Sequence, residues 1–489
     1  MSNTHVYQPR ISVKLRKTVM RDAVGEGAPV SARFKGSKQE IDLTQYLGES
    51  GGVTTSKAVN APAGTFTITF ADKPSGGMHG LDSVYGLVEP ADFVEIRASH
   101  DAKLGDPTLI MRGLVSRVVR SEAIDGSGRP VRTVTITGLD YGAFWQRQRL
   151  FYGQGFITGK DVLTNFKLFE RFEAGFKTTL TGADFVQEMI AKVVNPYVAA
   201  FFPENSTDPK GLLVDAQAKH GVVDVDGVQQ DGEPGTIYGL LRKYLDIGPW
   251  NELWIDEREE GPTVVYRPNP YLAIDGKTKI QEDAPDPEIV DLPAADVAAM
   301  TVERSDQDVS SYYWVDAPRF HLVGNDFSHL LWGVHGEKDM VDLSAYPNSS
   351  SRLYGERLMM ANTQMGADDI TSMKSGKGAK ETRERDVSQI DWVGQRRKTL
   401  VLQNRDNVCL ERGVLRVRGR PDIRPGVYVR LKRGGMEALY YVDSVIHEYQ
   451  PFNLFTSTLS VSRGTGFAEG AKRGGGSSSP YLAELQGLK

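Results

Sequence analysis

The sequence has almost no cysteine. Among 489 residues there is one, Cys409, which excludes an intrachain disulfide and any zinc or iron–sulfur site built from several cysteines. Its neighbours Val408 and Leu410 predict a packed, chemically inert thiol. This cysteine usage is typical of a protein that folds in a reducing cytoplasm.

Long apolar runs and an excess of one charge are missing as well. The longest apolar stretches, such as Tyr197–Phe202, fall far short of the roughly 20 residues that a membrane-spanning helix needs. No signal-peptide run follows the basic residues near the N-terminus. The 58 basic and 63 acidic side chains give a net charge of −5, whereas a dedicated nucleic-acid-binding protein is usually strongly basic. We therefore expect no membrane anchoring, and only local or transient contact with DNA.

What the sequence does contain is typical of a folded protein of several domains. Hydrophobic residues make up 40% of the chain, charged residues 25% and aromatic residues 9%. This composition favours globular structure over disorder. At roughly 150 residues per domain, the length predicts about three domains.

The N-terminal third reads as β-structure. Thr65–Phe70 alternates threonine with apolar residues, and Val131–Thr137 repeats the pattern, as strands with one buried face do. The Gly- and Asp-containing segment Asp125–Gly128 predicts a hairpin tip between the strands Leu114–Glu122 and Pro130–Gly138. Short strands separated by such turns favour a barrel or a sandwich over a parallel sheet.

The middle third reads as α+β. A helix of amphipathic spacing follows Thr181 and is expected to stop at Asn195-Pro196. A second helix is predicted at Thr236–Leu245. Two strands, Glu252–Asp256 and Thr263–Arg267, follow it.

Alternation returns in the last third, at Ile289–Leu292 and Val297–Glu303. A Lys/Gly-rich stretch, Lys374–Lys380, reads as a mobile loop, and Asp391–Leu410 is compatible with a helix. The late strands are predicted at Val414–Arg418, Val427–Leu431, Tyr440–His447 and Phe455–Ser462. A Gly/Ser run then leads to a C-terminal tail expected to be disordered until a partner captures it.

These patterns predict a mainly β fold with an α+β insertion. We expect two tube-like β-barrel domains, an inserted α+β domain and a flexible C-terminal tail. The predicted boundaries are 8–143 for the first barrel, 144–288 for the insertion, 289–466 for the second barrel with its own helical or loop insertion at about 320–411, and 467–489 for the tail.

Two blocks of the sequence show the same order of turns and strands. In each, a turn containing Pro opens a strand, a long strand crosses it, and a strand alternating in Thr or Ser closes the sheet. The first block holds the strands at Glu89–Arg97, Ile110–Val118 and Arg132–Tyr141, and the second those at Arg420–Arg430, Ala438–His447 and Thr456–Val461.

In these segments the chain resembles the baseplate hub proteins of tailed phages, the family that includes the late control protein D group and the hubs of contractile injection systems. The resemblance lies in the order of individually loose motifs, which spans most of residues 8–466. They are the crossing strand near Gly113, the Thr-rich strand ending at Gly138–Tyr141, the lead-in Glu303–Val309, the segment Leu353–Arg357 and the turn Gly419–Gly426. The long insertion from Phe144 to Asp283 departs from the smaller members.

The resemblance implies a structural role without catalysis or cofactors. It implies a homotrimeric ring that adapts a hexameric tail tube to a central spike in the virion baseplate, and a conduit for passing genomic DNA. The implied partners are further copies of the chain, the tail tube protein, the spike protein and other baseplate proteins, with the tape measure as a further candidate. Synthesis would take place in the host cytoplasm. Whether the tail is contractile is left open.

Two alternatives from other classes remain. Glycoside hydrolysis requires two carboxyl groups several ångströms apart, and Asp256 and Glu257 lie among other acids in the insertion, so a peptidoglycan-degrading enzyme is one alternative. Their position at a predicted turn favours a solvated hairpin instead. A receptor-binding tail tip, with the insertion as adhesin, is the other.

Other candidate sites lack the required spacing. His321, His329 and His335 are too widely separated for the usual short zinc-ligand pairs. The Lys374–Lys380 stretch lacks the GxxxxGK[ST] pattern of a phosphate loop, and no G-x-S-x-G motif occurs. We predict no catalytic, cofactor or metal site.

The best site candidates are structural. The segment from Arg396 to Arg433 has 12 basic and 3 acidic residues. This excess predicts an interface with another subunit or a neighbouring protein rather than DNA binding, with the acidic stretch Asp283–Asp308 as a candidate partner. The interface candidates in the turn after this block's helix are Arg420, Pro421, Asp422, Pro425 and Gly426. Those in the tail are Tyr481, Leu482 and Leu485, whose near-helical spacing predicts folding on a neighbour.

Overall fold

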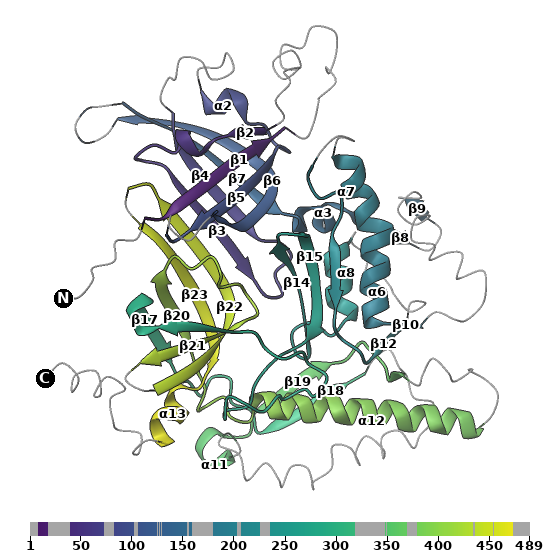
Figure 1. Cartoon of the computed structure of the whole chain (residues 1–489). Coiled ribbons are helices and arrows are strands. Elements are labelled where there is room, and N and C mark those ends of the chain that lie inside the picture. The colour runs from purple at the N-terminus through teal and green to yellow at the C-terminus, as the bar shows by residue number, and fades with distance from the viewer. Residues whose placement is uncertain are drawn as a thin grey trace, which may run out of the picture.

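A computed structural model of the chain describes residues 8–17, 40–72, 83–101, 106–124, 126, 128, 130–153, 156–158, 179–202, 207–224, 235–317, 348, 350–368, 379–433, 436–452 and 454–472. One large sheet dominates them (Figure 1). Its N-terminal strands are β1 (Arg10–Arg16), β2 (Glu40–Asp42), β3 (Gly52–Ala58), β4 (Thr65–Ala71), β5 (Phe93–Ser99), β6 (Thr108–Ile124) and β7 (Pro130–Asp140). Its C-terminal strands are β16 (Ile289–Pro293), β17 (Val297–Glu303), β20 (Glu411–Arg418), β21 (Tyr428–Arg433), β22 (Met436–Gln450) and β23 (Leu454–Gly464).

The sheet consists of two halves with the same strand order. The first half runs β3-β4-β7-β6-β5-β1, and the second runs β17-β20-β23-β22-β21-β16. Taken in chain order, each strand of the first half has a counterpart at the same place in the second. One difference is that β1 pairs with β5 antiparallel, whereas β16 pairs with β21 parallel. We call these units the first and second half-sheets.

The correspondence extends to single residues. Each of the two long strands has a bulge at the equivalent position. It lies between Val115 and Arg117 in β6 and between Val442 and Ser444 in β22. Aligning the bulges also aligns the cores. The chain Val53, Ile68, Ile136 and Val118 in the first half-sheet corresponds to Met300, Leu415, Leu459 and Val445 in the second. Each set packs in its own hydrophobic core.

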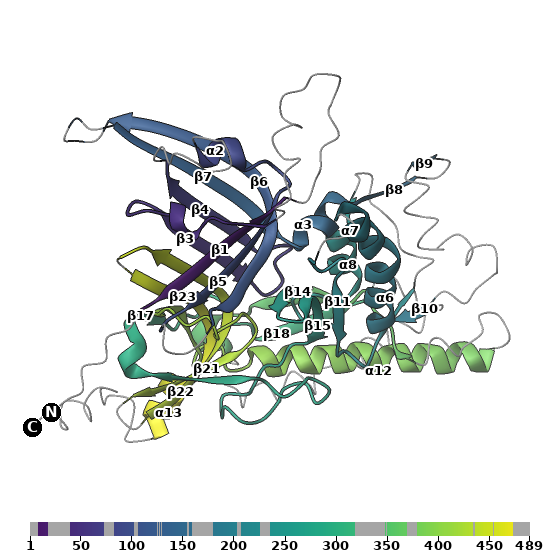
Figure 2. The same ribbon diagram turned by 45° about the horizontal axis from the view of Figure 1, so that its top comes forward.

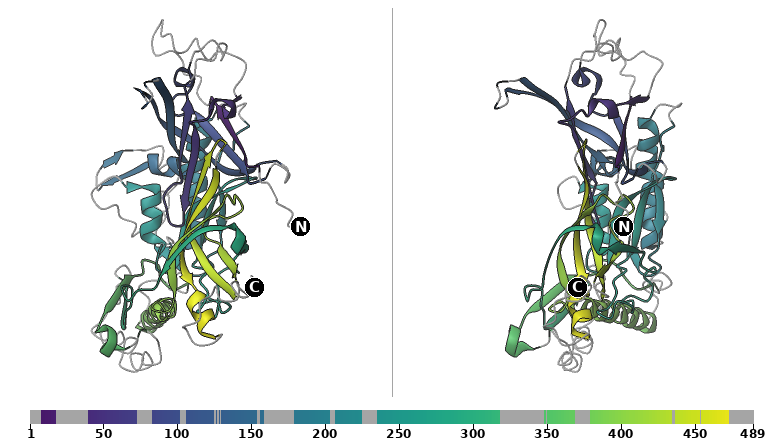
Figure 3. Two further views of the ribbon diagram at one scale, coloured as in Figure 1. Left: turned by 90° about the vertical axis from the view of Figure 1, so that its left-hand side faces the viewer. Right: turned by 60° about the vertical axis from the view of Figure 1, so that its left-hand side comes forward.

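The two half-sheets join edge to edge. The outer part of β22, Ser444–Tyr449, pairs antiparallel with Val53–Ala58 of β3. We call this contact the seam. Figure 3 shows the strands of both halves following one another across it in one sheet.

The expectation of two closed barrels therefore needs correction. Within the described residues the sheet is not closed. Its longest row of strands runs from β17 to β2, and β21 and β16 branch from β22. The strand patterns were read correctly, but alternation along a strand does not specify which edge its neighbour occupies. Two half-sheets sharing one sheet replace two separate tubes.

Residues 144–288, here called the middle segment, carry four of the eight α-helices among the described elements. These are α3 (Gly142–Arg147, which begins just before it), α6 (Gly182–Met189), α7 (Asn195–Phe201) and α8 (Ile237–Tyr244), with a π-helical turn at Ile190–Val194 between α6 and α7. The strands are β8 (Arg149–Gly153), β9 (Phe156–Thr158), β10 (Thr179–Thr181), β11 (Leu213–Ala216), β12 (Val222–Asp224), β13 (Gly235–Thr236), β14 (Asn251–Arg258) and β15 (Gly261–Pro268). Figure 1 shows the β14–β15 hairpin between the large sheet and helices α6–α8.

Threonine side chains cap the N-termini of two of these helices. The Thr181 hydroxyl accepts a hydrogen bond from the Asp184 backbone N–H, and Thr236 does the same for Gly239. The expected stop at Asn195-Pro196 is wrong, because the chain passes through the π-helical turn and Pro196 lies in the first turn of α7. A proline is tolerated there because no intrahelical partner exists for its missing N–H.

A smaller layer lies within the second half of the chain. It consists of β18 (Tyr312–Asp316), α11 (Ser351–Tyr354), β19 (Leu358–Asn362) and the long helix α12 (Ala379–Asn404), which packs on β18. The helix begins twelve residues before the predicted start at Asp391, and includes Ala379 and Lys380 of the expected loop. The rest of that loop, 374–378, and the three histidines considered above lie outside the described residues. The short helices α2 (Val84–Leu87) and α13 (Gly466–Lys472) complete the described elements, with 3-10 turns at Thr44–Tyr46 and Ala294–Asp296.

Candidate assembly surface and buried charged junction

The predicted turn before β21 is a fixed structural feature. The guanidinium of Arg420 contacts Asp422 at 2.6 Å and Asp296 at 3.3 Å. Burial alone would raise the pKa of Asp422, but the hydrogen bond and charge of Arg420 outweigh it and lower that pKa. Pro421 lines a small cavity beside the seam. The turn thereby ties the second half-sheet to the 3-10 turn that precedes β17.

The last two residues of this turn repeat a turn of the first half-sheet. Pro425 and Gly426 precede β21 as Pro90 and Ala91 precede the strand β5. Gly426 has a φ of +84° and Ala91 a φ of +75°. The N–H of Gly426 donates to the carbonyl of Val442, and that of Ala91 to the carbonyl of its counterpart Val115. The two blocks thus share their turn geometry as well as their strands.

The tail candidates Tyr481, Leu482 and Leu485 lie outside the described residues. Their predicted role in binding a neighbour stays a prediction.

The basic block meets the acidic stretch within the chain. Arg424 contacts Glu288 at 3.2 Å, and Arg430 and Lys432 contact Asp291 at 2.7 and 2.9 Å. Further contacts join Arg418 to Asp296 and Arg412 to Glu303 and Asp308. These pairs follow the contacts of β16 with β21 and of β17 with β20. The two stretches do pair, but these contacts lie within one chain, whereas the prediction was an interface with another subunit or a neighbouring protein.

The interpretation of Asp256 and Glu257 as members of a solvated turn is wrong. Their exposed fractions are 8% and 6%, because the turn of this hairpin comes later, after Arg258, and both acids lie in β14. Asp256 contacts Arg424 at 2.9 Å and Arg258 at 3.2 Å. The arrangement is one of buried, ion-paired carboxylates at a packing interface.

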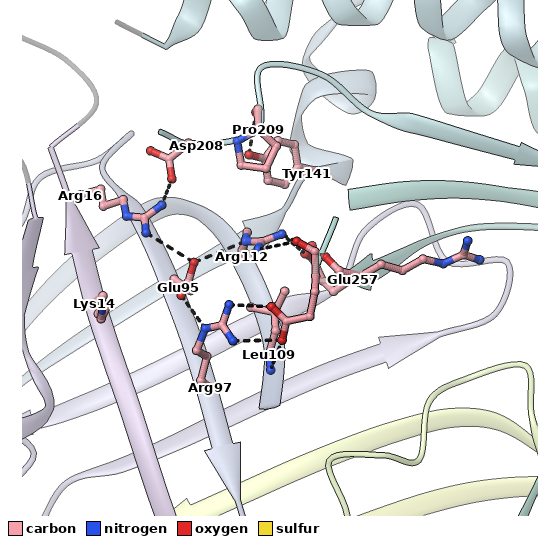
Figure 4. A network of polar contacts seen from close by, with 12 residues as sticks. Lys14, Arg16, Glu95, Arg97, Leu109, Arg112, Tyr141, Asp208, Pro209 and Glu257 are labelled. Atoms are coloured by element: carbon pink, nitrogen blue, oxygen red, sulfur yellow. Dashed lines mark hydrogen bonds and ion pairs between the residues drawn. The ribbon is translucent and has the colours of Figure 1, made fainter. Parts of the chain in front are cut away.

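This interface is a charged junction between the first half-sheet and the middle segment (Figure 4). Glu95 of β5 lies at its centre, within 3.6 Å of Arg16, 2.7 Å of Arg97 and 3.4 Å of Arg112. Arg97 also binds Glu259 of the β14–β15 turn through both carboxylate oxygens, at 3.0 and 2.8 Å. Arg16 reaches Asp208 of the middle segment.

A second group of charges continues this junction towards the seam. The Lys57 ammonium of β3 lies 3.1 Å from Asp140 and 3.6 Å from Glu257, and Arg112 lies 3.9 Å from Glu257. Sequence patterns missed the junction, although a signal was present. Glu95 stands between Val94 and Ile96 in a strand that is buried at all but one position, and a buried charge needs a partner.

The large sheet has several open strand edges among its described strands, including those of β2, which pairs only with β1, and of β16, which pairs only with β21. Among the described strands, β17 pairs only with β20, and the outer part of β6, Arg117–Ile124, pairs only with β7. Side chains of both segments are exposed or half-buried. Figure 2 shows the β6–β7 ribbon extending beyond the rest of the sheet. Open edges of this kind are pairing surfaces for another chain.

One face of the central sheet is rich in hydroxyl groups. Residues that alternate with the buried core positions are threonine or serine in four of the central strands. They are Thr54 and Ser56 of β3, Thr65, Thr67 and Thr69 of β4, Thr133, Thr135 and Thr137 of β7, and Thr458, Ser460 and Ser462 of β23. We call this surface the hydroxyl face. It crosses the seam and belongs to both half-sheets.

The described residues lack two features that would indicate other functions. No group of three or more His, Cys, Asp or Glu side chains there is arranged to hold a metal ion. In the same part of the chain, no helix has the length and apolar character needed to cross a membrane.

Comparison with known proteins finds similarity only among solved structures. No protein-family model matches the sequence, and no curated protein matches it significantly. A tail protein from Neisseria meningitidis MC58 is 12% identical, with a TM-score of 0.45 over 93% of this chain and 97% of that chain. The 43 kDa tail protein of prophage MuSo2 from Shewanella oneidensis is 12% identical, with a TM-score of 0.42 over 93% and 98%. Prophage tail protein gp18 from Listeria monocytogenes EGD-e is 10% identical, with a TM-score of 0.41 over 94% and 98%. The chain is thus similar, along most of its length, to tail proteins of prophages and bacteria.

Proposed function

We propose that this chain is the structural baseplate hub of a phage tail. In this proposal three copies form a ring that adapts the hexameric tail tube to the central spike and surrounds a channel for genome delivery. The observation that carries it is the repeated half-sheet, which gives one chain two nearly equivalent units. Three chains then supply six units, matching the sixfold symmetry of a hexameric tube.

The seam provides the rule for joining copies. Within one chain, the outer part of β22 pairs with β3. The strands equivalent to these are β6 and β17, and their corresponding edges are both open. Repeating the seam between chains therefore joins β6 of one copy to β17 of the next. Such a head-to-tail contact closes into a ring when the rotation between copies allows it.

The equivalence also predicts the register of this contact. In the seam, Glu448 lies opposite Thr54. Their counterparts, aligned through the bulges and strand pairings, are Ser121 and Thr301. Within one chain these two residues are separated by seven strand-to-strand steps, a path along the sheet of roughly 34 Å at about 4.8 Å per step. A disulfide between them requires two chains, since its Cα atoms lie about 4.4–6.8 Å apart.

Cysteine cross-linking tests the proposal. Oxidation of the double variant Ser121→Cys/Thr301→Cys should give dimers and trimers on non-reducing gels, and the two single variants should not. The pair Ser121→Cys/Val297→Cys is the matched control, because its second cysteine lies off register by four residues. Absence of cross-links, together with a monodisperse monomer at tens of micromolar in native mass spectrometry, would contradict the hub assignment.

The proposal assigns the remaining parts as follows. The first half-sheet (8–143) and the second (289–466) form the ring, and the middle segment lies outside it. The tail 467–489 contacts a neighbouring baseplate protein. The chain catalyses no reaction, and Asp256 and Glu257 serve packing. A zymogram band of peptidoglycan clearing that disappears on substitution of these two acids would show otherwise.

A further inference from the structure

The carboxylate of Glu257 lies at the junction without a fitting hydrogen-bond partner. Its side chain is 2% exposed, and no described group donates a hydrogen bond to either oxygen. Its nearest cations are Lys57 at 3.6 Å and Arg112 at 3.9 Å, and both are closer to another acid, Asp140 and Glu95 respectively. A buried carboxylate in this position is poorly compensated as an anion.

Charged groups face Glu257 from every strand packed around it. The first half-sheet contributes Lys57 from β3, Arg112 from β6 and Asp140 from the end of β7. On its own strand, Asp256 is neutralised by Arg258 and Arg424, the latter from the turn before β21. The neighbouring Tyr141 and His447 are also buried. Burial raises the pKa of Tyr141 and lowers that of His447 to about 4, so both are neutral near pH 7.

Three parts of the molecule meet at this point. A cavity of about 30 Å³, large enough for a water molecule, is lined by Glu257 of the hairpin, Thr55 and Lys57 of the first half-sheet, and Pro425 and His447 of the second. The hydroxyl of Thr55 is buried there without a hydrogen-bond partner. Since β3 and β22 form the seam, and both line this cavity together with Glu257, the Glu257 carboxyl lies next to the seam.

We propose that the junction is proton-responsive, with the β14–β15 hairpin held most firmly against the seam when the Glu257 carboxyl is protonated, and loosened when it ionises. Protonation removes the uncompensated negative charge and provides an O–H donor for the neighbouring acceptors. Ionisation leaves two cations, Lys57 and Arg112, to be shared among three acids. The inference rests on this geometry and does not depend on the proposed function.

The direction of the pH dependence follows from the burial of the group. Burial raises the pKa of Glu257 to about 7, with Asp140 and Asp256 adding to the effect and Lys57 and Arg112 opposing it. When the hairpin opens, the carboxyl regains water and its ordinary pKa near 4.5. Opening therefore becomes easier as the pH rises from about 4.5 to about 7, and its equilibrium levels off above 7.

Hydrogen exchange of the full-length protein between pH 5 and pH 8 tests this. After correction for the intrinsic pH dependence of exchange, the opening equilibrium of the β14 amides should rise roughly 50- to 100-fold across this range. Glu257→Gln should abolish the rise, because a neutral amide mimics the protonated acid. The matched control is Glu260→Gln in the same hairpin, whose side chain is exposed and should leave the rise intact.

A second variant separates titration of Glu257 from a packing defect. Asp140→Asn removes a neighbouring negative charge and frees Lys57 for Glu257, so the midpoint of the exchange profile should shift to lower pH. An unchanged profile in both Glu257→Gln and Asp140→Asn, or a flat profile in the natural protein, would overturn the proposal.

Discussion

Ala91 and Gly426 show how one backbone requirement is met by two residues. Both have positive φ, at +75° and +84°, in turns that open equivalent strands. Such angles are unfavourable for residues with a side chain. Ala91 tolerates its place, whereas Gly426 has no room for a side chain. A Cβ there would lie 2.7 Å from a guanidinium nitrogen of Arg267 and 2.9 Å from the Trp254 ring.

Gly426→Val should therefore destabilise the second half-sheet. The change combines backbone strain with a clash, and we expect a loss of about 3 kcal/mol in the free energy of unfolding. Chemical denaturation of the purified protein measures this loss, and virion yield should fall because β21 is misplaced. The first half-sheet should stay folded.

Ala91→Gly is the matched control for this prediction. Glycine relieves the positive-φ strain but increases the entropy of the unfolded chain, so the net change should stay within about 0.5 kcal/mol. A near-neutral Gly426→Val, with normal virion yield, would show that the turn does not set the position of β21.

Strands were the elements that the sequence specified best. Val297–Glu303 was predicted with its observed bounds, and the hairpin around Asp125–Gly128 lies where its turn residues indicated. Alternation and turn chemistry are local, so they are legible in a single sequence. The end of the helix that follows Thr181 was mispredicted. The π-helical turn at Ile190–Val194, which separates α6 from α7, leaves no comparable local signal in the sequence.

Pairing between distant strands was beyond the sequence. Nothing in the sequence of β3 or β22 alone indicates that they pair. The pattern of a strand shows which of its faces is buried, but not which strand lies at its edge. The charged junction was missed for the same reason. Glu257 reads as one acid among several, and it becomes unusual only because β3, β6 and β7 cover it.

The C-terminal tail is predicted to contact a neighbouring baseplate protein, and truncation tests this. Truncation after Arg473 removes the Gly/Ser linker and the apolar residues Tyr481, Leu482 and Leu485. If the proposed ring forms, we expect the truncated protein to fold and assemble into it, but to lose incorporation into particles or retention of the spike, because folding on a neighbour would supply that contact. Particle assays and native mass spectrometry measure the two effects separately. Fully infectious particles from the truncated protein would assign the segment no role in assembly.

In the whole molecule, the duplication of the half-sheet makes the hydroxyl face a continuous surface. The seam continues this face from one half to the other, and repeating the seam between copies would continue it around a ring. Threonine and serine offer neutral hydrogen-bonding groups, whereas lysine and arginine bind the phosphates of DNA and release counterions. A channel lined by hydroxyl groups would let a polyanion pass without holding it.

Placing lysine on this face tests whether it lines the channel. Thr67 and Thr137 lie opposite each other on neighbouring strands, and each substitution would be repeated in every copy of the ring. Thr67→Lys/Thr137→Lys should slow genome release from purified particles at low salt, and higher salt should restore the rate because phosphate contacts are screened. Thr67→Gln/Thr137→Gln adds similar bulk without charge and should release at the natural rate. Equal slowing by both double variants would indicate a steric or folding defect, and no slowing by the lysine pair would place the hydroxyl face away from the genome's path.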